Sequence, residues 1–173
     1  YVMGERAVDE DPNEEEIQQI AELVGQSIKG GAVGFSSNRL PGHILPDGRA
    51  IPGTFAKKDE LEAISMAVGD NNGLLQYVLN YSDLESEVSL IGEQGLLAEA
   101  PVVFSAVFVS GDAGHHSAYD STISNMRKKG LDITGLTLPR SFGSLSSLEN
   151  DVLPDRKSPT WQRLAAMNLP ERL

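Results

Sequence analysis

The alternation of helical and strand-like patterns constrains the fold of this chain more than any other feature. Four segments with apolar residues at helical spacing are each followed by a short, apolar, β-branched segment. This order predicts right-handed βαβ units, a parallel sheet and an α/β fold. The predicted helices cover residues 12–29, 58–69, 82–99 and 115–129, and the predicted strands cover residues 32–36, 74–81, 102–109 and 131–138.

The helix starts carry capping signals. Asp11 precedes Pro12 and is followed three residues later by Glu14, which predicts a capping box at the first helix. Ser82 and Glu85 have the same spacing at the helix over 82–99. Within that helix, Gly92 and Gly95 predict a weakened segment, because glycine is a poor helix former.

Four strands cannot close a barrel that needs eight. They fit either a small doubly wound sheet or half of a larger barrel. The last three strands recur about every 30 residues, close to the repeat of a (β/α)8 unit. We therefore predict a partial (β/α)8 TIM barrel of four parallel strands alternating with helices, with residues 1–173 its central, incomplete part. We expect residues 139–173 to form a loop-rich tail with a short helix over 161–167.

The composition excludes several classes of binding partner. The net charge of −11 argues against nucleic acid and an anionic membrane surface, since basic patches supply that affinity. The absence of cysteine excludes thiolate metal sites and a cysteine nucleophile. No apolar run approaches the roughly 20 residues of a spanning helix. We expect a small-molecule substrate, no nucleic acid, no membrane and a possible oligomer, with the cytoplasm as the default compartment.

The segment over 30–56 joins a strand to a long polar loop and then a helix, the arrangement in which α/β enzymes place their chemistry. Its Gly31-Ala32-Val33-Gly34-Phe35-Ser36 strand, Pro52-Gly53-Thr54-Phe55-Ala56 turn and Asp59-Glu60-Leu61 helix start resemble the D-aminoacylase (N-acyl-D-amino-acid deacylase) branch of the amidohydrolase superfamily. The resemblance extends from Val2 to about Leu173. It identifies a family and leaves the substrate open.

The resemblance implies a metal-dependent hydrolase of carbon–nitrogen amide bonds on a (β/α)8 barrel. It implies zinc or another divalent metal, with a His-x-His pair and an aspartate outside this span. Two metal-binding histidines of the family are missing here: Gln76, Tyr77 and Val78 occupy the first place, and Ser105 followed by Ala106 the second. Within this chain we identify no metal ligand. A non-catalytic protein that binds a small ligand or serves as a scaffold is therefore the alternative.

Four residues after strands are candidate substrate contacts. His43 is a possible ligand, base or substrate contact, and its alternative is a solvated loop histidine. Arg39 and Arg140 are suited to a substrate carboxylate. The alternative for Arg39 is a surface pair with an acidic neighbour, and that for Arg140 is a structural salt bridge. Asn80 lies at the end of its strand, and the nearby Asp83 is expected to cap the next helix.

Three further signals are weak. His115 and His116 are adjacent, so they point in different directions on a helix and make a poor metal pair. Ser36 lacks the Gly-x-Ser-x-Gly elbow of a serine hydrolase. The glycines of residues 30–34 precede a strand, which is the wrong context for a phosphate loop.

Overall fold

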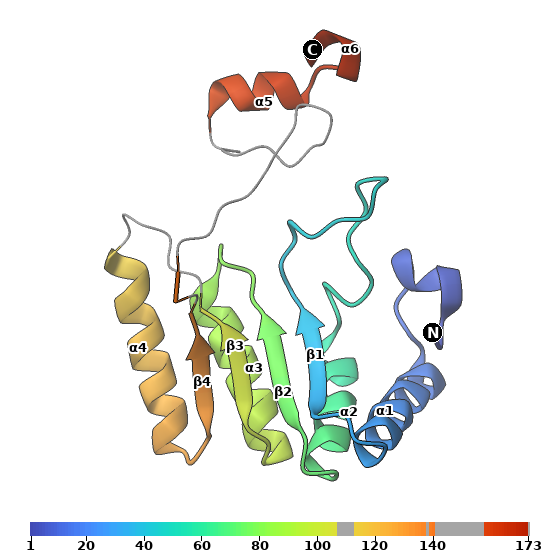
Figure 1. Ribbon diagram of the computed structural model, residues 1–173, viewed down its shortest axis with the longest axis vertical. Helices are drawn as coiled ribbons and strands as arrows, with labels where there is room; N and C mark the ends of the chain where they lie inside the picture. The colour runs from blue at the N-terminus through green and yellow to red at the C-terminus, as the bar shows by residue number, and fades with distance from the viewer. Residues whose placement is uncertain (107–112, 138, 141–157, 173) are drawn as a thin grey trace.

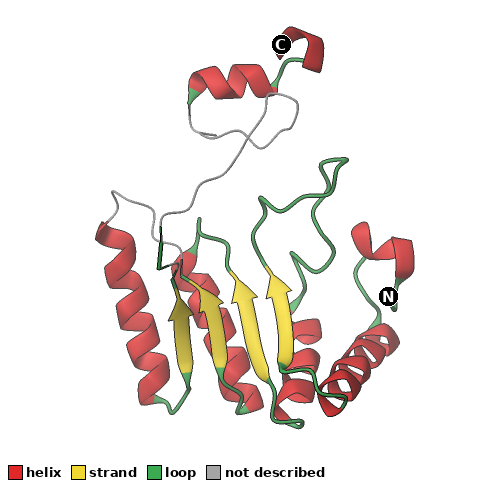
Figure 2. Ribbon diagram, viewed as in Figure 1, coloured by secondary structure: helices red, strands yellow, loops and turns green. Residues whose placement is uncertain are grey.

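A computed structural model describes residues 1–106, 113–137, 139–140 and 158–172 (Figure 1). Within the described part of residues 1–137, four α-helices and four strands alternate (Figure 2). A short 3-10 helix, η1, precedes them and two short helices follow. The elements are η1 (Gly4–Val8), α1 (Glu14–Lys29), β1 (Gly34–Asn38), α2 (Lys58–Gly69), β2 (Leu74–Val78), α3 (Leu84–Ala98), β3 (Val102–Ser105), α4 (Ala113–Lys128), β4 (Ile133–Leu136), α5 (Pro159–Ala165) and α6 (Leu169–Arg172).

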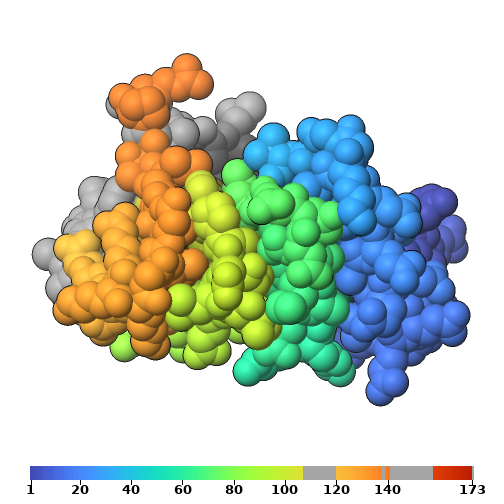
Figure 3. All heavy atoms as spheres, turned by 90° about the horizontal axis from the view of Figure 1, so that it is seen from below, coloured from blue at the N-terminus to red at the C-terminus, as the bar shows by residue number. Residues whose placement is uncertain are grey.

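The sheet has the order β1-β2-β3-β4, and every neighbouring pair is parallel. The helices follow the same order, because α1 packs on α2, α2 on α3 and α3 on α4. Seen from the amino ends of the strands, the chain crosses the molecule in sequence order (Figure 3). A doubly wound sheet would place helices on both faces and reverse its strand order. The predicted α/β fold with four parallel strands is therefore confirmed, in the arrangement of part of a (β/α)8 barrel.

Alternate residues of the strands define a covered face and an open face of the sheet. On the covered face, Leu75, Val102 and Ile133 lie side by side in register and are fully buried under the helices. Tyr77 and Phe104 form the next buried row. The main apolar core thus lies between the sheet and the helices.

The open face carries the other set of side chains. Ser36, Gln76, Val103 and Thr134 are neighbours across the four strands, and each remains partly or fully exposed. The Ser36 hydroxyl donates a hydrogen bond to the Gln76 side-chain oxygen. In a closed barrel this face would line the interior.

Both predicted capping boxes are wrong. Asn13, rather than Asp11, caps α1: its Oδ1 accepts from the Glu16 N–H at 3.0 Å, and Glu16 accepts from the Asn13 N–H at 3.0 Å. The two candidate boxes have the same spacing, so sequence does not distinguish them. Asp11 instead pairs with Lys57 at 2.7 Å.

At α3 the capping position falls on Asp83, whose side chain makes no capping hydrogen bond. The Ser82 N–H donates to Asn80 Oδ1 at 3.1 Å, so a turn replaces the predicted box.

Other element bounds differ from the predictions by a few residues. The strand predicted over 32–36 is displaced to Gly34–Asn38, and that over 74–81 ends at Val78. The helix predicted over 58–69 is confirmed. In the tail, α5 covers Pro159–Ala165, while residues 141–157, with most of the predicted loop, lie outside the described residues. Within the described part of the chain, no helix combines the length and apolarity needed to cross a membrane.

Candidate functional site

The β1–α2 loop leaves the carboxyl end of β1 and has an ordered internal structure. Ile44 and Ala50 form an antiparallel bridge, and a turn between Leu45 and Arg49 closes it, with the Leu45 N–H donating to the Arg49 carbonyl at 2.8 Å. Arg49 pairs with Asp47 at 2.7 Å and with Asp9 at 2.6 Å. Both ion pairs are exposed, and the one with Asp9 connects the loop to the amino-terminal segment. His43 lies at the base of this small hairpin.

His43 contacts the last residue of β1. Its Nδ1 lies 2.7 Å from the Asn38 side-chain oxygen. The Asn38 amide group donates to Thr54 Oγ1 at 3.3 Å. Thr54 is 1% exposed, and it belongs to the Pro-Gly-Thr-Phe-Ala turn. The arrangement joins the strand end, the histidine and the far end of the loop.

Arg39 forms a nearly buried ion pair on the helix side of the sheet. Its Nε donates to Glu87 Oε2 at 2.9 Å and its Nη2 donates to Glu87 Oε1 at 3.0 Å. The two side chains are 14% and 10% exposed. Glu87 Oε2 also accepts from the Asn80 N–H at 3.3 Å. Glu87 therefore brings together two sequence-predicted site residues at the ends of β1 and β2.

The Arg39 guanidinium has one further donor nitrogen, Nη1. Its Nη1 is buried and has no hydrogen-bond partner within the part of the chain that the structure describes. Tyr77 lies close enough for the Arg39 charge to act on its hydroxyl. Burial raises the pKa of Tyr77, and a hydrogen bond with Ser65 and the charge of Arg39 partly offset that rise.

The remaining sequence candidates lie apart from this cluster. Arg140 is exposed and follows β4 by four residues. His115 and His116 lie in the first turn of α4, where the side chains are outside the described residues. Asn80 uses its side-chain oxygen in the turn before α3, since it accepts from the Ser82 N–H.

The residues at the positions where the resemblance implies metal-binding histidines do not form a metal site. Gln76 and Ser105 belong to the open face of the sheet. Tyr77 and Ala106 belong to the buried core on the opposite face. Among the side chains that the structure describes, which exclude those of His115 and His116, no group of three or more His, Asp or Glu residues is arranged to hold a metal ion. The described residues therefore do not fit zinc, which needs three or four protein ligands.

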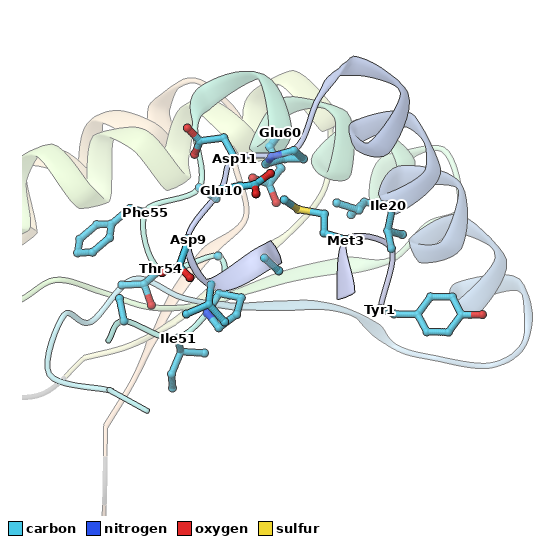
Figure 4. Close-up of a pocket in the computed structure, with 18 of the residues that line it drawn as sticks. Tyr1, Met3, Asp9, Glu10, Asp11, Ile20, Ile51, Thr54, Phe55 and Glu60 are labelled. Carbon is cyan, nitrogen blue, oxygen red and sulfur yellow. The ribbon is translucent and has the colours of Figure 1, made fainter. Parts of the chain in front are cut away.

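A pocket of about 470 Å³ lies between the amino-terminal segment and the loop (Figure 4). Glu10, Asp11 and Glu60 come close together on one side of it. Burial, then the charges of Asp59 and Asp11, raises the pKa of Glu60. Thr54 lines this pocket and also contacts Asn38, whereas the four sequence-predicted site residues do not line it.

Sequence reasoning missed Asn38, Thr54 and Glu87. Asn38 was missed because the strand was predicted to end two residues too early. Glu87 has a usable signal: it follows Leu84 by three residues and precedes Ile91 by four, so it shares the buried face of α3. A carboxylate at such a position predicts a buried cationic partner.

Comparison with known proteins yields one informative match. No family model matches the chain, and no curated protein does. A solved structure, the N-acyl-D-glutamate deacylase from Bordetella bronchiseptica complexed with zinc and a phosphonate inhibitor that mimics the tetrahedral intermediate, superimposes with a TM-score of 0.58. The sequences are 20% identical, and the match covers 73% of this chain and 26% of that chain.

The chain thus spans about a quarter of the length of the structure that it matches. At this level of identity the likeness concerns fold. It agrees with the resemblance carried by the Gly-Ala-x-Gly-Phe-Ser strand and the Pro-Gly-Thr-Phe-Ala turn. Over the matched region, the chain has the fold of part of that deacylase structure.

Proposed function

We propose that the protein containing this chain hydrolyses carbon–nitrogen bonds of non-peptide amides, with an N-acyl amino acid as the substrate class. The observation that carries the proposal is the fold shared with a deacylase over 73% of the chain. The two sequence motifs support it, because they lie on β1 and on the loop at its carboxyl end. In sheets of this kind that end is where substrates bind.

His43 is the described side chain best suited to proton transfer in this reaction. It is exposed on the loop and linked to Asn38. Arg39 is paired with Glu87, and its Nη1 is buried without a partner among the described residues, so it would contact a substrate carboxylate only after its side chain moves. Asn80 and Arg140 remain proposed substrate contacts at the ends of β2 and β4.

A small-ligand-binding or scaffold protein is the second candidate. Gln76, Tyr77 and Val78, and Ser105 with Ala106, occupy the places where the resemblance implies metal-binding histidines, and this favours it. In the neighbouring structure zinc is bound, whereas here the proposal of a metal rests on that likeness alone.

The test uses the protein in its full encoded length and a panel of N-acyl D- and L-amino acids, with release of the free amine as the readout. We expect hydrolysis of at least one class, and a loss of roughly 100-fold in kcat/KM for His43→Gln if the imidazole transfers a proton. Lys29→Gln is the control, since Lys29 is exposed at the end of α1, before the amino end of β1, whereas His43 follows the carboxyl end of that strand. No hydrolysis, together with no stoichiometric zinc, iron or manganese, would leave the binding protein as the better reading.

A further inference from the structure

The orientation of the Asn38 amide is set by backbone groups that cannot be reversed. The Leu40 N–H donates to Asn38 Oδ1 at 3.4 Å, and Asn38 Nδ2 donates to the Leu40 carbonyl at 3.4 Å. A flipped amide would place its oxygen against that carbonyl and its NH₂ against that N–H. The Asn38 Nδ2 contact with Thr54 Oγ1 is compatible with the observed orientation. The oxygen of Asn38 is therefore the atom that faces His43.

This orientation determines which nitrogen of His43 carries a proton. An amide oxygen only accepts hydrogen bonds, so the contact of 2.7 Å requires His43 Nδ1 to donate. In the neutral ring the proton then lies on Nδ1, and Nε2 keeps a free electron pair. The described residues supply no hydrogen-bond partner for Nε2, and the side chain is exposed.

We propose that Asn38 is a positioning residue that holds neutral His43 in the Nδ1–H form, so that Nε2 acts as the acceptor toward a ligand. The ligand group is an N–H or O–H donor, such as a substrate amide or a water molecule. The imidazole takes up a proton at Nε2 without losing its hydrogen bond to Asn38, because Nδ1 donates in both protonation states. The identity of the donor rests on the proposed function, but the protonation state of the ring does not.

Thr54 gives the Pro-Gly-Thr-Phe-Ala turn a part in this arrangement. Its hydroxyl is buried and receives a hydrogen bond from the Asn38 amide, 16 residues away in sequence. The turn thus supports the side chain that orients the histidine. A backbone contact within the loop, from the His43 N–H to the Leu40 carbonyl at 3.1 Å, places the ring near the strand end.

The test is a long-range ¹H–¹⁵N NMR spectrum of the ¹⁵N-labelled protein, in its full encoded length, at a pH where His43 is neutral. His43→Gln assigns the ring signals by their disappearance. We expect the wild-type ring to show a protonated, pyrrole-type Nδ1 and an unprotonated, pyridine-type Nε2. The reverse pattern in the wild-type protein would overturn the proposal without any other variant.

Asn38→Leu removes the acceptor, and the ring is then expected to shift toward the Nε2–H form that free imidazole side chains favour in water. Thr54→Val, which keeps the Leu40 contacts, is expected to shift it less. A backbone amide spectrum close to wild type confirms folding of each variant. An unchanged His43 pattern in a folded Asn38→Leu protein would show that Asn38 does not set the protonation state.

Activity separates this inference from the proposed function. If the protein hydrolyses amides, Asn38→Leu is expected to lower kcat about tenfold or more with a smaller change in KM, since the base would present the wrong nitrogen. A rise in KM with kcat unchanged would contradict a role through His43. If no amide is hydrolysed while the ring shows the Nδ1–H pattern and loses it in Asn38→Leu, the proposed function fails and the assignment of Nε2 as acceptor stands.

Discussion

At the scale of single residues, Glu87 connects parts of the fold that lie far apart in the sequence. Its carboxylate receives two donors from Arg39 and the N–H of Asn80, so it joins the ends of two strands to α3. Arg39 was predicted as a substrate contact or as half of a surface pair. It forms an ion pair, but one that is nearly buried, which makes each charge dependent on the other.

Glu87→Gln is expected to lower the free energy of unfolding by about 3 kcal/mol, because it leaves the Arg39 charge without its counter-charge in a poorly solvated position. The double variant Arg39→Met with Glu87→Leu should recover most of that loss, since two apolar chains of similar size need no partner. Urea-induced unfolding followed by circular dichroism measures both.

Arg49→Met is the matched control for that prediction. It removes a guanidinium from two exposed ion pairs, those with Asp47 and Asp9. Exposed pairs contribute little, so the loss should be much smaller than that of Glu87→Gln. Equal losses in Arg49→Met and Glu87→Gln would contradict the role assigned to burial.

At the scale of elements, the glycines of α3 allow close packing, which their low helix propensity does not indicate. A Cβ at Gly95 would lie 2.4 Å from Val102 Cγ2 and 2.7 Å from Leu131 Cδ1. A Cβ at Gly92 would meet the side chain of Met126, with Cγ at 2.8 Å and Sδ at 2.9 Å. The sequence reading took both glycines as weak points of the helix. The structure shows close approach of α3 to its neighbours at both.

Gly95→Ala is expected to destabilise the protein by about 1–3 kcal/mol despite the better helix propensity of alanine, because β-branched Val102 and buried Leu131 have little freedom to move. Gly92→Ala should cost less, since methionine is unbranched and adapts its shape. Thermal unfolding of the two variants beside the wild type tests the order. A more stable Gly95→Ala protein would show that propensity outweighs the contact.

At the scale of the whole molecule, the sheet is open. Its residues Ser36, Gln76, Val103 and Thr134 face away from the helices, and Leu136 at the end of β4 is 56% exposed. Within the described residues β1 and β4 have no strand on their outer sides. Such edges offer unpaired backbone groups to other chains.

Residues 1–173 expressed as an isolated polypeptide are therefore expected to dimerise or aggregate, since half of a barrel leaves two edges and one face uncovered. Size-exclusion chromatography with light scattering measures the mass as a function of concentration. A monomer that unfolds in a single sharp transition would contradict the half-barrel interpretation.

The sequence by itself determined the class of fold, because hydrophobic periodicity is a local property. The stripe of Leu61, Ile64 and Val68 predicted α2 with its observed bounds, and the apolar run after Leu74 predicted a buried parallel strand. The alternation of such segments is enough to predict a parallel sheet covered by helices. Where two capping signals had equal spacing, as at Asp11 and Asn13, the local pattern did not choose between them.

Only the tertiary structure decided that the sheet follows the order of part of a barrel, because strand order and helix side depend on contacts between segments far apart in the chain. It also decided the composition of the candidate site. The contact of Asn38 with Thr54 spans 16 residues and that of Arg39 with Glu87 spans 48. Neither separation follows from the period of a helix or a strand, so the sequence pattern does not predict either contact. Their hydrogen bonds form only because β1, α3 and the β1–α2 loop meet at the carboxyl end of the sheet.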